Sequence, residues 1–283
     1  MSRRHTRPAA FILLAGAVSL AGPAHVFGQG RGQPPEPPPT AKAAAPIDLT
    51  GYWVSLVTED WRYRMVTPAK GDYQGVPMNA EAGKVAQAWD PAADEKAGNQ
   101  CKSYGAAAIM RVPGRLHITW PDDNTLRIDT DAGVQTRTLR FDPSAPKSAE
   151  PSWQGDSAAR WEGSGGRGRG RPGGPGGDGR GGAADGPGGG GRGPATPRFG
   201  SLKVVTTNMR AGYLRKNGVP YSENAVVTEY FDLAPQRNGD QLLVVTTVVE
   251  DSKYLQQPFI VSSQFKMQAG ARGWDPTPCS STW

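Results

Sequence analysis

A lone carboxylate lies among mostly apolar residues in the segment 225–231. Strand side chains alternate between two faces, so Glu229 shares a face with Val227 and Phe231. If that face is the inner one, burial raises the pKa of the carboxyl group and suits it to general acid–base chemistry such as isomerisation, hydration or cyclisation. The alternative is an outer position opposite Lys or Arg, which is commoner for a strand carboxylate.

A second constellation depends on the pairing of two neighbouring predicted strands. Aligning their apolar faces places His117 beside Arg127 or Asp129. A His117–Asp129 pair can transfer protons, and Arg137 on the next strand could join it or Glu229. The alternative is a polar ladder on a solvated sheet face, the normal unit of sheet stability.

Aromatic and charged residues are dense in the segment 59–64, after the first predicted strand. Trp61, Arg62 and Arg64 could line the mouth of a pocket, where guanidinium and indole groups suit carboxylates, sugars or aromatic ligands. The alternative is that Trp61 and Tyr63 pack beneath a rim of salt bridges.

Several chemistries are excluded by what the chain lacks. His117 is the only histidine once the first 28 residues are removed, so multi-histidine metal sites are excluded. Gly-x-Ser-x-Gly and Walker motifs are missing as well. We therefore expect neither a metal nor another cofactor.

The first 28 residues have the three parts of a secretory signal: arginines, an apolar run over about 9–20, and a small-residue exit that favours cleavage after Gly28. The apolar run is too short to span a bilayer. A Pro/Ala-rich spacer follows over 29–47. The sequence predicts a protein exported to the periplasm or outside the cell, without stable membrane insertion.

The net charge of +6 arises mainly outside the predicted domain. The signal carries three Arg, and the stretch 164–198 carries six Arg against two Asp. The remainder is nearly neutral, which argues against a nucleic-acid partner. The Gly/Arg-rich segment 164–196 is predicted to be a disordered insert that expands the tip of a hairpin.

Cys101 and Cys279 are the two cysteines of the chain. An even number in an exported protein favours a disulfide, with two free buried cysteines as the alternative. The bridge would tie the carboxyl tail to the early part of the domain.

The elements that must position these residues are mostly strands. One helix is predicted over 80–89, with Asn79 as its cap and Asp90-Pro91 at its end. The missing crossover helices disfavour a parallel α/β fold. We predict an all-β, antiparallel, lipocalin-like or calycin-like barrel over 48–283, with a sandwich as the alternative. The predicted strands are 50–58, 115–120, 125–130, 134–141, 153–162, 200–208, 225–233, 241–249 and 258–267.

The segment 48–53 (DLTGYW) resembles the Gly-x-Trp opening of lipocalin-type barrels, in which the tryptophan closes one end. The segments 151–163 (PSWQGDSAARWEG), 201–207 (SLKVVTT) and 212–231 (GYLRKNGVPYSENAVVTEYF) resemble an uncharacterised family of exported bacterial β-barrel proteins. This resemblance covers most of 48–279 and implies a fold and export, without an activity. The chain departs from the family by its insert and by Tyr221-Ser222 where relatives carry His-Ser, which weakens a catalytic role there.

Three functions fit these observations. The first is a barrel that binds a small apolar or aromatic molecule between aromatic walls formed by Trp53, Trp120, Tyr230 and Phe231. The second is a cofactor-independent enzyme that uses Glu229 or the His117–Asp129 pair. The third is an envelope interaction module in which the Arg-rich insert contacts an anionic polymer.

Overall fold

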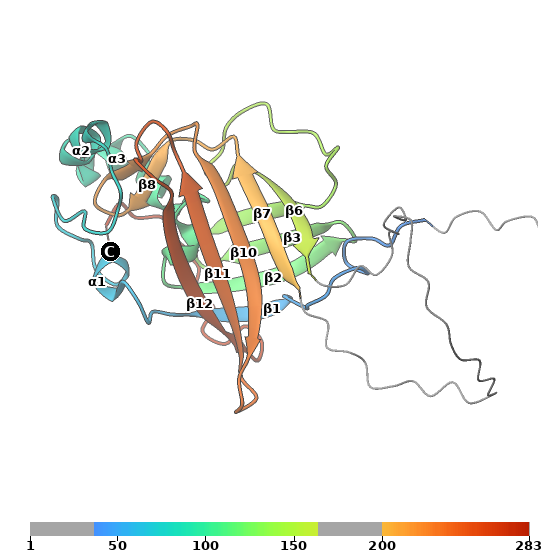
Figure 1. The fold of residues 1–283 in the computed structure, drawn as a ribbon. Helices are drawn as coiled ribbons and strands as arrows, with labels where there is room; N and C mark the ends of the chain where they lie inside the picture. The colour runs from blue at the N-terminus through green and yellow to red at the C-terminus, as the bar shows by residue number, and fades with distance from the viewer. Residues whose placement is uncertain (1–36, 164–199, 283) are drawn as a thin grey trace, which may run out of the picture. The chain divides into compact units, whose positions relative to one another are not determined.

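The computed structural model describes residues 37–163 and 200–282 of the 283-residue chain. The predicted signal peptide, the first part of the spacer (29–36) and the Gly/Arg insert lie outside these residues. Within the described residues, nine strands form a closed barrel (Figure 1). In their order around the wall they are β1 (Gly51–Leu56), β12 (Phe259–Gln268), β11 (Gln241–Glu250), β10 (Val226–Pro235), β7 (Ser201–Thr207), β6 (Asp156–Glu162), β5 (Gln135–Arg140), β3 (Thr125–Thr130) and β2 (Arg115–Asp122).

The barrel wall is a mixed sheet. β5 and β6 pair in parallel, at Leu139 with Ser157, whereas the other neighbouring pairs are antiparallel. An odd number of strands cannot alternate in direction all the way around a closed ring. At least one parallel pair is therefore required, and the connection 141–155 returns the chain for it. The predicted all-β barrel is confirmed, but its fully antiparallel character is wrong.

The two strands that flank the undescribed insert pair with each other. β6 and β7 are antiparallel from Asp156 opposite Thr207 to Glu162 opposite Ser201. This register confirms the predicted hairpin.

Apolar side chains fill the interior that the barrel strands enclose. Their alternation in each strand places every second residue inside. The Trp53 indole donates a hydrogen bond to the Leu49 carbonyl at 3.0 Å and is fully buried. The apolar core around it includes Ile118, Leu126, Ile128, Leu202, Val204, Phe231, Leu243, Val245 and Phe265.

More helices form than the single one predicted. The described residues contain α1 (Trp61–Arg64), α2 (Ala80–Gln87) and α3 (Pro91–Lys96), and the 3₁₀ helices η1 (Gln100–Tyr104) and η2 (Ile109–Arg111). The expected cap of α2 is confirmed, since the Asn79 side chain accepts from the Ala82 amide at 2.9 Å. Asp90 and Pro91, expected to end that helix, instead begin α3, because the Asp90 carboxylate accepts from the Ala92 and Ala93 amides.

These helices gather at one end of the barrel, which we call the capped end (Figure 1). The chain from 57 to 114 leaves β1 and returns to β2 there. The second connection at this end, 208–225, contains a hairpin of β8 (Gly212–Arg215) and β9 (Val219–Tyr221), which the sequence analysis missed.

The carboxyl tail is fixed to the domain by the predicted disulfide. Cys101 and Cys279 are bonded, with their Cα atoms 5.1 Å apart. Next to the bridge, β13 (Thr277–Pro278) pairs in parallel with β4 (Ala132–Gly133). Among the helices of the described residues, none has the length and apolar character needed to cross a membrane.

Candidate functional site

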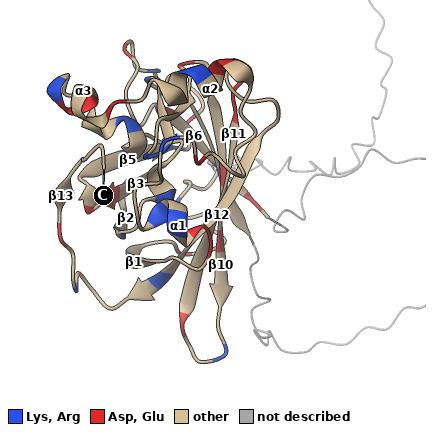
Figure 2. Ribbon diagram, turned by 90° about the vertical axis from the view of Figure 1, so that its left-hand side faces the viewer, with Lys and Arg blue, Asp and Glu red and all other residues tan. Residues whose placement is uncertain are grey.

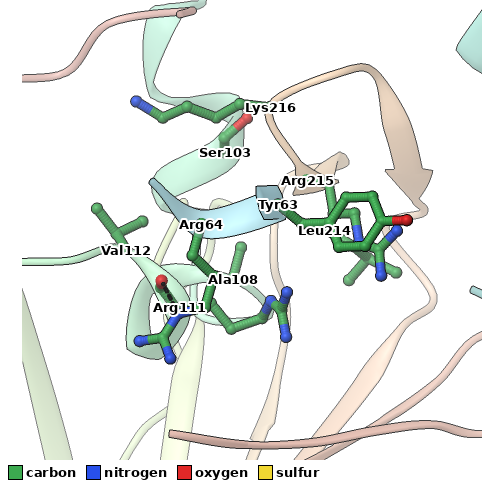
Figure 3. A pocket seen from close by; sticks show the side chains of 9 residues that line it. All are labelled: Tyr63, Arg64, Ser103, Ala108, Arg111, Val112, Leu214, Arg215 and Lys216. Atoms are coloured by element: carbon green, nitrogen blue, oxygen red, sulfur yellow. Dashed lines mark hydrogen bonds between the residues drawn. The ribbon is translucent and has the colours of Figure 1, made fainter. Parts of the chain in front are cut away.

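A small pocket at the capped end brings together three buried arginines (Figure 3). We call it the arginine pocket. Its volume is about 20 Å³, which is room for roughly one water-sized group. Figure 2 shows α1, which supplies part of the lining, as a basic segment. The lining residues are Tyr63, Arg64, Ser103, Ala108, Arg111, Val112, Leu214, Arg215 and Lys216.

The three arginines each end a short element. Arg64 is the last residue of α1, Arg111 of η2 and Arg215 of β8. Their exposed fractions are only 1%, 6% and 4%. The pocket thus depends on three segments that are far apart in sequence, and Figure 3 shows their side chains lining it with the guanidinium groups pointing in different directions.

Hydrogen bonds and ring stacking fix the guanidinium groups. Arg64 donates from Nε to the Arg111 carbonyl at 2.9 Å and from Nη2 to Ser55 Oγ at 3.2 Å. Arg215 donates from Nη1 to the Gln74 carbonyl at 2.7 Å, and its guanidinium carbon lies 4.0 Å from the centre of the Tyr63 ring. These contacts hold the cations in place before any ligand binds.

Each guanidinium nevertheless retains a buried nitrogen that has no hydrogen-bond partner among the described residues. These nitrogens are Arg64 Nη1, Arg111 Nη2 and Arg215 Nε. A buried donor without an acceptor costs about 1–3 kcal/mol, and more when it is charged. All three belong to residues that line one pocket, and a negatively charged acceptor that reaches such a donor would remove this cost.

The pocket has an excess of positive charge. Within the described residues, the one ion pair made by these three arginines joins Arg111 Nη1 to Asp60 Oδ2 at 3.2 Å. Burial, followed by the charge of Arg111, lowers the pKa of Arg64 and of Arg215 to about 10. Burial lowers the pKa of Arg111 as well, against the opposing effect of Asp60. The site therefore stabilises the charged guanidinium groups less well than water does, and a bound anion would offset that cost.

Lys216 connects the pocket to the carboxyl tail. Its ammonium group donates to the Tyr104 hydroxyl at 2.6 Å and to the Thr282 carbonyl at 3.4 Å. Burial lowers the pKa of Lys216 to about 7. A charge close to the pocket therefore changes near neutral pH.

Glu229 faces the barrel interior, which was one of the two predicted positions. It is fully buried, and Arg137 pairs with it from β5. The carboxylate is therefore an ion-pair partner rather than a lone acid among apolar groups.

His117 and Asp129 lie directly opposite each other on β2 and β3, as expected. Their side chains are engaged elsewhere, however. The His117 ring stacks on Tyr52, with ring centres 4.0 Å apart. Asp129 accepts hydrogen bonds from Arg127 and Thr136. His117 therefore has aromatic neighbours, whereas Asp129 has polar ones.

The other predicted ligand-binding residues separate into different regions. Arg64 lines the arginine pocket, whereas Arg62 pairs with Asp72 and Trp61 is exposed. Of the predicted aromatic wall, Phe231 is buried in the barrel core, whereas Tyr230 alternates with it along β10 and lies under the Lys203 ammonium.

The two tryptophans of that wall have different surroundings. Trp53 is enclosed in the apolar core. Trp120 packs against Phe141 and Trp161, with ring centres 5.5 and 6.4 Å away. Neither tryptophan lines the arginine pocket.

Sequence reasoning missed Arg111 and Arg215. Arg111 directly follows the apolar run 106–110, and Arg215 follows Leu214 before a turn. A basic residue at the end of an apolar run indicates a buried cation. The sequence does not show, however, which of these cations come together in the fold.

The fold and this site define the class of protein as a closed, mixed β-barrel with a cationic pocket at its capped end. Comparison with protein families, curated proteins and solved structures finds no match for the chain.

Proposed function

We propose that this protein is an exported binding protein for a small molecule that carries an anionic group, which the arginine pocket holds. The observation that carries the proposal is the set of three buried guanidinium nitrogens without protein acceptors, in a pocket where one carboxylate pairs with the three arginines among the described residues. An oxyanion would accept from these donors and offset the mutual repulsion of the arginines.

The size of the pocket favours a compact anion. A volume of about 20 Å³ has room for one oxygen atom of a small head group such as a carboxylate. A carboxylate oxygen accepts charge-assisted hydrogen bonds from guanidinium nitrogens. The proposed ligand therefore enters by its head group, at the capped end instead of the apolar barrel interior that the sequence analysis favoured.

Export is part of the same proposal. The Cys101–Cys279 disulfide is expected to persist in an oxidising compartment such as the periplasm or the outside of the cell. The predicted signal at residues 1–28 supports the same location.

The experiment measures the binding of formate, acetate and inorganic phosphate by calorimetry at constant ionic strength. Variants Arg64→Met, Arg111→Met and Arg215→Met should each weaken carboxylate binding at least tenfold. Arg127→Met removes an exposed arginine outside the pocket and serves as the control. Equal affinity in the pocket variants and the control would refute the proposal.

A further inference from the structure

The arginine pocket has room for the head group of a ligand and little else. The remainder of a larger ligand must therefore lie against the protein surface beside the pocket. The helix α1 lies beside the pocket, because its Tyr63 and Arg64 line it. The exposed side of the same helix decides which chemistry the remainder of the ligand can have.

That side carries exposed apolar residues. Trp61, Met65 and Val66 are exposed by 65%, 53% and 52%. Trp61 and Met65 are four residues apart, and the Met65 amide donates to the Trp61 carbonyl at 2.8 Å, so both lie on one face of the turn. We call these three side chains the α1 apolar surface. Such a concentration of large apolar groups in water marks an interaction site.

We infer that the ligand is an amphiphile: its carboxylate enters the arginine pocket and its hydrocarbon chain lies along the α1 apolar surface. This inference depends on the proposed function and assigns it a ligand class. The buried arginines bind the charged head group, and the exposed apolar side chains of α1 bind the hydrocarbon chain of the ligand.

A free amphiphile fits this site better than a bilayer surface. The three arginines are at most 6% exposed, so the head group must leave water and enter the pocket singly. A head group fixed in a membrane cannot do so while its chain stays among the lipids. The occupant is therefore a single molecule bound from solution.

The test compares acetate, hexanoate, octanoate and decanoate below their micellar concentrations by calorimetry with the full mature chain. Affinity should rise about two- to fourfold for each added methylene that the apolar surface covers. A flat series with measurable acetate binding would overturn the inference and leave the proposed function intact. Failure of every member to bind would overturn both.

Two variants make the test specific. Trp61→Gln combined with Met65→Gln should abolish the dependence on chain length and keep acetate affinity within twofold. Val134→Asn removes an apolar side chain that is 59% exposed outside α1, and should leave the whole series unchanged. An unchanged chain-length dependence in the double variant, or binding to phosphatidylglycerol vesicles in place of octanoate, would overturn the inference.

Discussion

Arg137 on β5 and Glu229 on β10 form a two-bond ion pair inside the barrel, where both side chains are fully buried. Arg137 Nη1 lies 2.9 Å from Glu229 Oε1, and Nη2 lies 2.5 Å from Oε2. Arg137 also donates to Thr206, whose hydroxyl bonds to that of Ser157. A polar group of four side chains thus links β5, β6, β7 and β10.

Glu229→Gln should lower the free energy of unfolding by about 3–5 kcal/mol, because it leaves the Arg137 charge buried without its partner. Urea denaturation measures this loss. The double variant Arg137→Met/Glu229→Met should recover most of the stability, since it removes both charges. A double variant less stable than Glu229→Gln would contradict this explanation.

Replacement of both Cys101 and Cys279 by Ser should reduce stability by up to about 5 kcal/mol, the chain-entropy value for a loop of this length. The bridge spans a sequence separation of 178 residues, so its removal enlarges the conformational freedom of the unfolded chain. Denaturation of the reduced wild type provides the matched comparison. Equal midpoints for oxidised and reduced protein would exclude this role.

Stability should increase between pH 7 and 9 through Lys216. Burial lowers its pKa from 10.5 to about 7 in the folded protein, so in this range the unfolded chain binds more protons than the folded one. The free energy of unfolding therefore rises with pH, by roughly 2 kcal/mol over the range. Lys216→Met should flatten this part of the profile. A wild-type profile that falls from pH 7 to 9 would show that the sign is wrong.

Asp60→Asn should act in opposite directions on stability and on anion binding. Asp60 adopts a left-handed backbone with φ of 51°, which Asn also tolerates, so the main change is the loss of the carboxylate paired with Arg111. The unliganded protein should lose about 1 kcal/mol, whereas acetate affinity should rise several-fold because a competing negative charge is gone. Asp240→Asn removes a carboxylate that contacts Lys266 and Asn238 and does not line the arginine pocket, so it is the control. Weaker acetate binding in Asp60→Asn would contradict the prediction.

Local patterns in the sequence determined most of the barrel wall. Alternation with a period of two identifies strands such as β3 and limits the neighbour of His117 to Arg127 or Asp129, because adjacent apolar faces must align; the structure pairs it with Asp129. The Asn79 cap and the hairpin across the insert depend on equally local chemistry. The two cysteines indicated their own pairing.

Only the tertiary structure decided the parallel pairing of β5 with β6 and the position of Glu229 opposite Arg137. Ring closure and the choice of the inner face depend on all the strands together, so no single segment encodes them. The arginine pocket arises in the same way. Arg64, Arg111 and Arg215 belong to three separate segments, and their meeting depends on how the two long connections pack over the capped end.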